Sequence, residues 1–389
     1  MQTDKIYFAY GSQDGELFKI ALKTGILTMI TLGIYRFWAK SRIRRHIWSS
    51  ASIGEDRFEY HGTGLEKFLG FLIAIVVLAI YLGLVQLILI YFGLNLFQMT
   101  DDPAQVFAQT AAIYLNLLAV LPLAAFATYR ARRYKLARTS WRGIRFGMDN
   151  GAWGYVWRYL FYSLLTLVSL GALMPLATFR LEKYMADRSF VGDAPIAQNG
   201  KWAELYPSMK YIFFGVLCVL GAVVIAFGAI KIGIIAGFLG CIVLVCGLVH
   251  YNVQSFAYLM THKTLNKTVG FSATPRTKRI LATYILGGIV VGLITGIFGA
   301  VFGGISFTLF SVGNASTLGF LFTGLTYLGF FVLANALSLI MITQPILEHM
   351  FSSITVHNSS DLEKIFQTVR RSPADAEGFA DALDIGGAF

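Results

Sequence analysis

Six long apolar stretches dominate the pattern of hydrophobic and polar positions along the chain. Each is long enough to cross a bilayer as a helix, because about 20 apolar residues span the hydrocarbon layer. They form three pairs with short connections, QMTDDPA, a turn around Lys231, and SVGNAST. The pattern therefore predicts three transmembrane helical hairpins. The six stretches are residues 68–97, 106–129, 211–230, 232–260, 280–310 and 318–342.

Two further apolar stretches, residues 17–38 and 153–179, are interrupted by Lys19, Lys23 and Arg158. Short cytoplasmic loops accumulate Lys and Arg, so the distribution of cations favours one topology over another. If both stretches only dip into the membrane, 31 of the 32 Lys and Arg residues lie on one face. If both cross it, that bias largely disappears. We therefore predict six crossings, cytoplasmic termini, and two re-entrant or interfacial elements.

The segments that follow these two stretches resemble each other. A shift of 138 residues lays LGIYRFWAKSRIRRHIWSSASIGED on LGALMPLATFRLEKYMADRSFVGDA. The shift pairs Gly33 with Gly171 and Arg42 with Arg180. We infer that the two marginal stretches belong to two copies of one membrane element.

A second shift, by 50 residues, lays YFAYGSQDGELF on RFEYHGTGLEKF. Weaker versions of the same pattern occur at GIRFGMDNG, PIAQNGKWAELY and VGFSATP. Alternating aromatic and β-branched residues bounded by glycine are typical of short strands. These segments therefore predict a small β-structured cap on the cytoplasmic face.

Together the patterns predict an α-helical polytopic membrane protein. It has three transmembrane hairpins, two repeated re-entrant or interfacial elements, and small cytoplasmic β-structured segments. The predicted parts are the N-terminal strand-like segment with the first repeated element and its basic segment (1–67), the first hairpin (68–129), the basic segment with the second copy (130–210), the second hairpin (211–260), a cytoplasmic loop (261–279), the third hairpin (280–345) and a cytoplasmic tail (346–389).

The composition excludes a soluble globular domain, since 56% of the 389 residues are hydrophobic and only 14% are charged. Cys218, Cys241 and Cys246 all lie in apolar stretches without metal-ligand spacing, so neither a disulfide framework nor a zinc site is expected. HExxH, P-loop and GxSxG motifs in their required settings are missing from the sequence. We therefore expect no enzymatic activity, no metal and no cofactor.

Clusters of cations directly follow the apolar stretches, where they would face the headgroups of an anionic leaflet. The simpler alternative is that these cations only set the orientation of the helices in the membrane, as the positive-inside rule describes. Membrane phospholipids are the expected partners, and nucleic acid is not, because no nucleic-acid-binding module is recognisable. The candidate lipid- or anion-facing residues are Arg36, Lys40, Arg42, Arg44, Arg45, Arg130, Arg132, Arg133, Arg180 and Lys183.

None of the 21 carboxylates lies inside the six apolar stretches, which disfavours a proton-coupled transporter. His250, Asn252 and Gln254 form the one compact polar group on such a stretch. This group is either an interhelical hydrogen-bond cluster or a site for a neutral solute or for gating. Glycines at 288, 292, 296, 299 and 303 share one helix face, which predicts that residues 280–310 form a tightly packed central helix, with a pore lining as the alternative.

Five motifs occur in order over nearly the whole chain: GELFKI, LGIYRFWAKSRIRR, FEYHGTGLEKFLGF, WRGIRFGMDNGAWGY and the terminal AEGFADALD. Together they resemble the YjgN-like family of bacterial inner-membrane proteins, a domain family of unknown function. The resemblance implies a bacterial inner membrane and supplies no catalytic residues. In the second copy Thr178 stands where the first has Lys40, so a role of that cation is not duplicated.

Two functions fit these observations. The first is a channel or transporter for a neutral, anionic or lipidic solute, because discontinuous membrane elements in corresponding halves are typical of transport folds. The second is a non-transporting membrane scaffold or sensor, in which the cap and the tail recruit a cytoplasmic protein partner.

Overall fold

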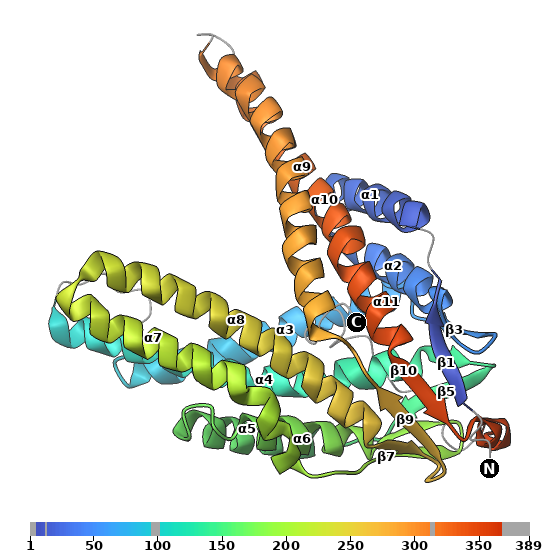
Figure 1. Cartoon of the computed structure of the whole chain (residues 1–389). Helices are drawn as coiled ribbons and strands as arrows, with labels where there is room; N and C mark the ends of the chain where they lie inside the picture. Colours follow the sequence, from blue (N-terminus) through green and yellow to red (C-terminus); the bar gives the residue numbers. More distant parts are fainter. Residues whose placement is uncertain (1–4, 12–13, 95–101, 312–315, 368–389) are drawn as a thin grey trace. The chain divides into compact units, whose positions relative to one another are not determined.

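The computed structural model describes residues 5–11, 14–94, 102–311 and 316–367. Contacts divide the chain into two compact units. Unit 1 comprises Met1–Glu59 and Gln198–Lys364, and unit 2 comprises Tyr60–Ala197 and Ile365–Phe389. Helices predominate in the described residues of both units, and the strands are short (Figure 1).

One order of elements occurs five times along the described residues: an entry strand, two helical arms and an exit strand. We call each such set a module. The first comprises β1 (Lys5–Tyr10), α1 (Asp14–Ile30), α2 (Arg36–Ser50) and β2 (Ala51–Ile53). The second comprises β3 (Asp56–Tyr60), α3 (Gly64–Tyr91), α4 (Pro103–Ala137) and β4 (Thr139–Trp141). The third comprises β5 (Ile144–Met148), α5 (Ala152–Val168), α6 (Met174–Ala186) and β6 (Ser189–Val191).

The last two modules keep this order and add helical segments to their arms. The fourth comprises β7 (Ala194–Gln198), the 3₁₀ segment η1 (Trp202–Met209), α7 (Lys210–Gly228), α8 (Ile230–Thr261) and β8 (Lys263–Leu265). The fifth comprises β9 (Val269–Ala273), α9 (Thr277–Ser311), α10 (Ser316–Ser338), the π-helical segment η2 (Leu339–Thr343), α11 (Gln344–Ser352) and β10 (Ile354–His357), and the 3₁₀ segment η3 (Ser359–Lys364) follows it.

One backbone hydrogen bond recurs at the base of every module. The residue directly after the entry strand donates its N–H to the carbonyl of the residue directly before the exit strand. This base bond holds the start of the first helical arm against the end of the second. The five bonds are Gly11 to Ser50 (2.9 Å), His61 to Arg138 (2.8 Å), Asp149 to Arg188 (2.9 Å), Asn199 to His262 (2.8 Å) and Thr274 to Ser353 (3.1 Å).

Antiparallel pairing joins neighbouring strands inside each unit. The order is β8, β9, β10, β1, β2, β3 in unit 1 and β4, β5, β6, β7 in unit 2. Phe8 lies opposite Ile53 in the first module, and Phe146 lies opposite Val191 at the corresponding positions of the third. The turn between β4 and β5 carries positive φ angles at both of its residues, as a tight two-residue hairpin requires.

The five alternating segments predicted from the sequence are the five entry strands, so their prediction as strands is confirmed. The exit strands were not predicted. With three or four residues each, as in β2 and β10, they are too short to show an alternating pattern. Their pairing is visible only in three dimensions.

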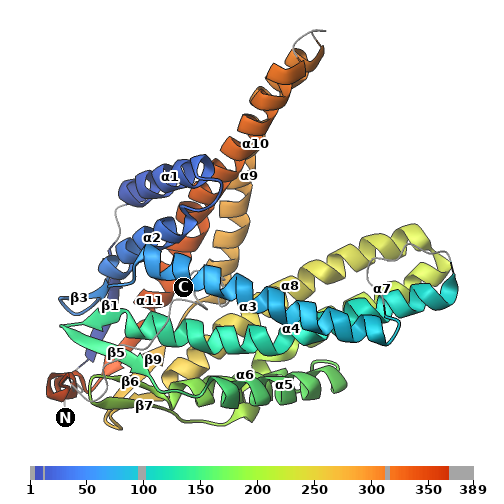
Figure 2. The same ribbon diagram turned by 180° about the vertical axis from the view of Figure 1, so that it is seen from behind.

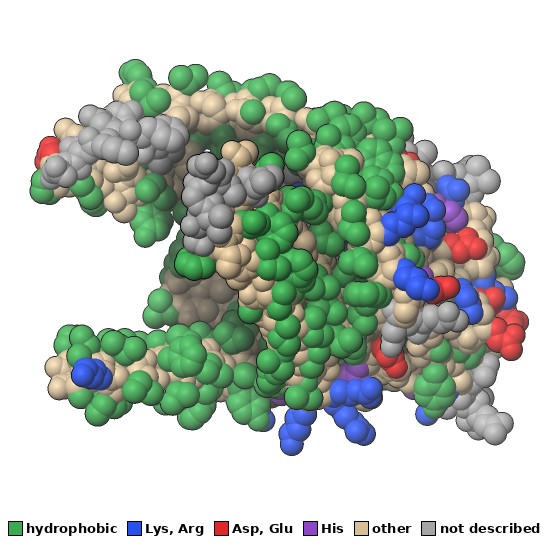
Figure 3. Space-filling view, turned by 90° about the horizontal axis from the view of Figure 1, so that it is seen from above, with side chains coloured by type: hydrophobic (Ala, Val, Ile, Leu, Met, Phe, Trp, Pro, Cys, Tyr) green, Lys and Arg blue, Asp and Glu red, His purple; other side chains and the backbone are tan. Residues whose placement is uncertain are grey.

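Among the described residues, six helical segments are long and apolar enough to cross a membrane, and they contain most of each of the six stretches predicted from the sequence. α7 lies beside α8, α9 lies beside α10, and α3 lies beside α4 (Figures 1 and 2). On the face drawn in Figure 3, hydrophobic side chains cover most of the long helices. Such outward apolar surfaces are expected where the surrounding solvent is lipid. The segments are Gly64–Tyr91, Pro103–Ala137, Trp202–Gly228, Ile230–Thr261, Thr277–Leu309 and Gly319–Ser352.

The glycine face of α9 does not pack as the sequence predicted. A Cβ atom added at Gly288, Gly292 or Gly296 would meet no heavy atom within 4 Å. α9 instead buries Val291 and Thr295, each three residues after one of these glycines and on the adjoining part of the helix surface. The prediction of close packing along the glycines is therefore wrong for this part of the helix.

The two marginal apolar stretches form short helical hairpins, α1 with α2 and α5 with α6. Their turns share one backbone geometry, with φ angles of 49° and 92° at Leu32 and Gly33, and of 50° and 89° at Leu170 and Gly171. In both turns the glycine N–H bonds to the carbonyl five residues earlier, over 2.7 Å. The leucines at the two tips are 94% and 95% exposed.

Because both turn glycines adopt a left-handed backbone, we predict that Gly33→Ala and Gly171→Ala each lower the free energy of unfolding by about 1–2 kcal/mol. No atom crowds either position, so the cost comes from the backbone alone. Gly83→Ala in α3 is the matched control, since Gly83 is equally uncrowded and lies inside a helix. Thermal unfolding followed by circular dichroism in detergent measures all three. Equal stability of all three variants would contradict the prediction.

Candidate functional site

A pocket of about 190 Å³ lies between α8, α9 and α11 in unit 1. Its walls are mainly apolar, and its polar groups are the amide of one asparagine and the phenol of one tyrosine. No charged side chain is among its lining residues. The lining residues are Val249, Asn252, Val253, Ile280, Tyr284, Ile346 and Met350.

Helical spacing explains why these side chains meet. Val249 and Val253 are four residues apart on α8, and Ile280 and Tyr284 are four residues apart on α9. Ile346 and Met350 have the same spacing on α11. Residues four apart lie on one face of a helix. Each of the three helices thus contributes one face to the pocket.

The polar group predicted around His250 is not a single cluster. The ring of His250 lies edge-on to that of Tyr211, with centroids 4.7 Å apart. Asn252 lines the pocket, and the Gln254 amide donates to the Thr277 hydroxyl over 3.2 Å. Each of the three predicted residues therefore has its own surroundings. Helical geometry separates Asn252 from the other two, because residues two apart do not share a face. His250 and Gln254 are four residues apart but contact different partners, Tyr211 and Thr277.

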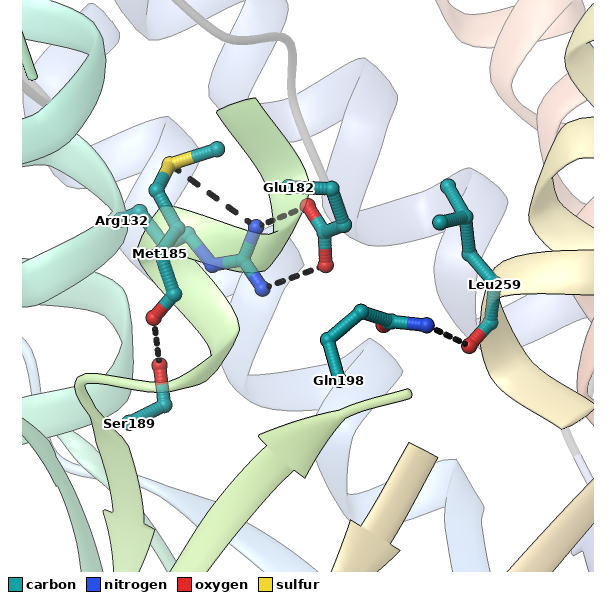
Figure 4. Close-up of polar contacts among 6 residues, drawn as sticks. All are labelled: Arg132, Glu182, Met185, Ser189, Gln198 and Leu259. Atoms are coloured by element: carbon teal, nitrogen blue, oxygen red, sulfur yellow. Dashed lines mark hydrogen bonds and ion pairs between the residues drawn. The ribbon is translucent and has the colours of Figure 1, made fainter. Parts of the chain in front are cut away.

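Arg132 is held inside unit 2 by a bidentate ion pair. Its guanidinium donates to both oxygens of Glu182, over 2.6 and 3.0 Å, and Figure 4 shows the two side chains pointing toward each other from α4 and α6. The neighbouring Arg133 is buried and donates from Nε to the Met148 carbonyl over 3.1 Å. Both cations therefore make contacts within the protein. This pairing could not be predicted from the sequence, because Glu182 lies 50 residues from Arg132 along the chain.

Two more predicted cations also make contacts within the protein. Arg44 is only 1% exposed and lies 5.9 Å from the centre of the Trp48 ring, so it does not face lipid. Lys183 forms an ion pair with Asp187 over 3.0 Å.

The remaining predicted cations lie closer to the surface. The side chain of Lys40 is half-buried, and Arg130 is half-buried beside the Phe126 ring at 5.8 Å. The other four are exposed and stay candidates for lipid or anion contact. They are Arg36, Arg42, Arg45 and Arg180.

A polar contact beside the base bond recurs between modules. Tyr134 and Tyr258 occupy the same position, five residues before an exit strand, and their hydroxyls donate to Glu66 and Glu204 over 2.9 and 2.8 Å. Both glutamates lie six residues after the end of an entry strand. Arg138 also donates to Glu66, over 3.1 and 3.2 Å. Burial alone would lower the pKa of Arg138. The hydrogen bond and the negative charge of the Glu66 carboxylate outweigh this effect, so the pKa of Arg138 is raised above its usual value.

Two other modules place a polar ring at the same position and bond it to the backbone. The Tyr184 hydroxyl donates to the Gly151 carbonyl over 2.9 Å, and the His349 Nε2 accepts from the Arg276 N–H over 2.9 Å. In the fourth module the buried Gln198 adds a bond to the Leu259 carbonyl over 3.0 Å (Figure 4). The sequence analysis missed these contacts. A signal in the sequence is the glutamate that recurs in RFEYHGTGLEKF and PIAQNGKWAELY, as Glu66 and Glu204.

The described residues contain no group of three His, Cys, Asp or Glu side chains that could hold a metal ion. Cys218, Cys241 and Cys246 are free thiols. The groups that the sites described above present are apolar walls, amides, phenols and guanidinium groups.

In the described residues, six long apolar helices on short strand-paired bases give a mainly α-helical class of structure that is compatible with a membrane protein. The chain belongs to the family described as bacterial protein of unknown function (DUF898), whose sequence pattern matches residues 5–382. This agrees with the resemblance found in the sequence motifs.

Two curated relatives carry the name inner membrane protein YjgN. The chain is 27% identical to the Salmonella typhimurium protein over 150 aligned residues. This aligned segment covers 38% of this chain and 33% of the relative. The chain is 25% identical to the Escherichia coli K12 protein over 171 aligned residues. This aligned segment covers 44% of this chain and 38% of the relative. The matched segments thus span little more than a third of these relatives' length. No solved structure matches the chain.

We predict that Arg132→Met lowers the free energy of unfolding by roughly 2–3 kcal/mol, because it leaves the half-buried Glu182 carboxylate without its partner. Lys183→Met is the matched control, since it breaks a more exposed pair worth about 0.5 kcal/mol. The double variant Arg132→Met/Glu182→Leu is expected to recover part of the loss, because no charge then stays unpaired. Denaturant unfolding in detergent gives the three values. Equal losses from Arg132→Met and Lys183→Met would contradict the prediction.

Proposed function

We propose that the protein is a bacterial inner-membrane transport protein that admits a neutral or lipidic solute to the pocket between α8, α9 and α11. This proposal rests on the composition of the pocket wall, which is mainly apolar and has no charged side chain. An ionised solute would lose its hydration there without gaining a charged partner, which is costly. A neutral solute or an acyl segment finds apolar contacts, and Asn252 and Tyr284 can satisfy one or two hydrogen-bonding groups.

The size of the pocket limits which solutes can bind in it. Drug-sized ligands occupy sites of about 300–1,000 Å³, so a pocket of about 190 Å³ accepts only a small molecule or part of a chain. The pocket also lies among helices long enough to cross the membrane. A lipidic solute can therefore enter it from the surrounding bilayer. Transport without a catalytic step is the activity that we propose.

We infer that the two short hairpins enter and leave the membrane on one face, which gives six crossings and cytoplasmic termini. α1 and α5 have 17 residues each, about 25 Å of helix, which is short of a hydrocarbon layer of about 30 Å. Their equivalent turns support a common role for the two hairpins as repeated re-entrant elements. The positive-inside bias of the sequence supports this orientation.

A reporter inserted after Asp187 tests the topology. We expect a cytoplasmic signal there, because α5 and α6 would return to the face from which they entered. The control is an insertion at Lys231, in the first turn of α8 beside its short connection to α7, which is expected on the opposite face. An extracytoplasmic signal at Asp187 would contradict the six-crossing arrangement.

Flux measurements in proteoliposomes test the transport proposal. The purified chain is assayed with a panel of ions, neutral solutes and fluorescent lipids. Val249→Trp fills the pocket and is expected to slow movement of the neutral or lipidic solute about tenfold or more. Val245→Trp, one turn away on α8 at a side chain that is 59% exposed and outside the pocket lining, is the control and is expected to keep the flux.

The outcome separates the two functions that the sequence left open. If no member of the panel moves, or if the two variants have the same flux, the transport proposal fails. The alternative is then the scaffold or sensor that recruits a cytoplasmic protein partner through the tail.

A further inference from the structure

Two guanidinium groups converge on one tyrosine ring in unit 2. The Cζ atoms of Arg188 and Arg158 lie 3.6 and 4.4 Å from the centre of the Tyr184 ring. The ring itself is buried, and its hydroxyl is fixed by the Gly151 carbonyl at 2.9 Å. Tyr155 packs beside it, with ring centroids 6.2 Å apart. The two arginines therefore share a rigid aromatic support.

Small residues make this arrangement possible. A Cβ atom at Gly151 would lie 3.0 Å from the Tyr184 hydroxyl oxygen and 3.1 Å from Nε of Arg188. A Cβ atom at Gly154 would lie 3.3 Å from Nη1 of Arg158 and would collide with the Tyr184 hydroxyl. The glycines at the start of α5 thus let both cations approach the ring.

Both arginines keep unused donors. Each donates one hydrogen bond to a backbone carbonyl, Arg158 to Gly154 over 2.9 Å and Arg188 to Tyr184 over 3.1 Å. A guanidinium has five N–H donors, so most of them are left for a ligand. Stacking on an aromatic ring leaves these in-plane donors accessible.

The nearby carboxylates do not neutralise this pair. Glu182 is bound by Arg132, and Asp187 is bound by Lys183. Asp149 donates its backbone N–H to the Arg188 carbonyl, but its carboxylate forms no ion pair with a described residue. Within the described part of the chain, neither Arg158 nor Arg188 has a carboxylate partner. Two positive charges held on one tyrosine ring without such partners favour the binding of an anion beside that ring.

The position of Arg158 on α5 indicates what kind of anion this is. Arg158 follows directly after Trp157, and both Trp153 and Trp157 are exposed, as is typical of side chains in the headgroup layer. Large apolar side chains continue from this level along the same face of α5 toward the tip of the hairpin. They are Phe161, Leu164 and Val168, which are 57%, 59% and 74% exposed.

We propose that Arg158 and Arg188 bind the phosphate of a membrane phospholipid, with its acyl chains lying along the exposed apolar face of α5. Guanidinium groups bind phosphate oxygens bidentately, so two of them can hold one phosphate from two sides. The excess positive charge favours an anionic lipid such as phosphatidylglycerol over a zwitterionic one. The site differs from the cation clusters that the sequence indicated, and it does not depend on the transport proposal.

Native mass spectrometry of the full-length chain in detergent, titrated with phosphatidylglycerol or phosphatidylcholine, tests the proposal. We expect Arg158→Gln/Arg188→Gln to weaken phosphatidylglycerol binding about tenfold or more. The matched control is Arg142→Gln/Arg145→Gln, which removes the same charge from two exposed arginines of unit 2. It is expected to change binding less than about twofold. If the double variant does not fold, Arg158→Gln alone is used, because its side chain is exposed, and a several-fold loss is expected.

Two further arms distinguish a lipid from a free anion. Phosphatidylglycerol is expected to raise the unfolding temperature of the wild-type chain more than phosphatidylcholine does, and inorganic phosphate alone is expected to leave it unchanged. Stabilisation by inorganic phosphate that is lost in Arg158→Gln/Arg188→Gln would assign the site to a soluble anion and overturn the lipid proposal. Unchanged lipid binding in that variant, or an equal loss in the control, would also overturn it.

Discussion

The base bond between the residue after each entry strand and the residue before each exit strand is the constraint on which the rest of the structure depends. It fixes both ends of a pair of helical arms at one point, with donor–acceptor distances of 2.8 to 3.1 Å in all five modules. Two helical arms that start and end together must run out and return. Long arms and short arms are therefore built on the same base.

This construction explains how one chain combines different membrane elements. Where the arms are long and apolar, as in α3 with α4 or α7 with α8, the module can cross the bilayer twice. Where the arms are short and a Leu-Gly turn reverses them, the module forms a compact hairpin with an exposed leucine at its tip. The polar contacts beside the base, such as the bond from the Tyr134 hydroxyl to Glu66, stabilise the same junction. They lie near the ends of the long helices and place no charged group in the middle of those helices.

Much of this fold could be predicted from the sequence, because hydrophobic length and alternation are local signals. The six long helices and the five entry strands follow directly from them. The exit strands could not be predicted, since a strand such as Ala51–Ile53 depends on a partner across the module. The turn at Leu32 was hidden inside an apolar run, and only the left-handed backbone at Leu32 and Gly33 reveals it.

The candidate sites were less predictable than the fold, because side-chain partners are set by distant residues. Arg132 looks like any cation after an apolar stretch until Glu182 is placed against it. Asn252 was identified as part of a polar trio, but its surroundings come from three different helices. Arg158 and Arg188 were not selected at all, since 30 residues separate them and Tyr184 unites them only in the folded chain.

Amide hydrogen exchange at the five base-bond donors, measured with residue resolution, tests the modular construction most directly. The amides of Gly11, His61, Asp149, Asn199 and Thr274 are predicted to exchange as slowly as the paired strands beside them, because opening one of them opens a module. Exchange of these amides at the rate of exposed loops, while the neighbouring strands stay protected, would contradict the account.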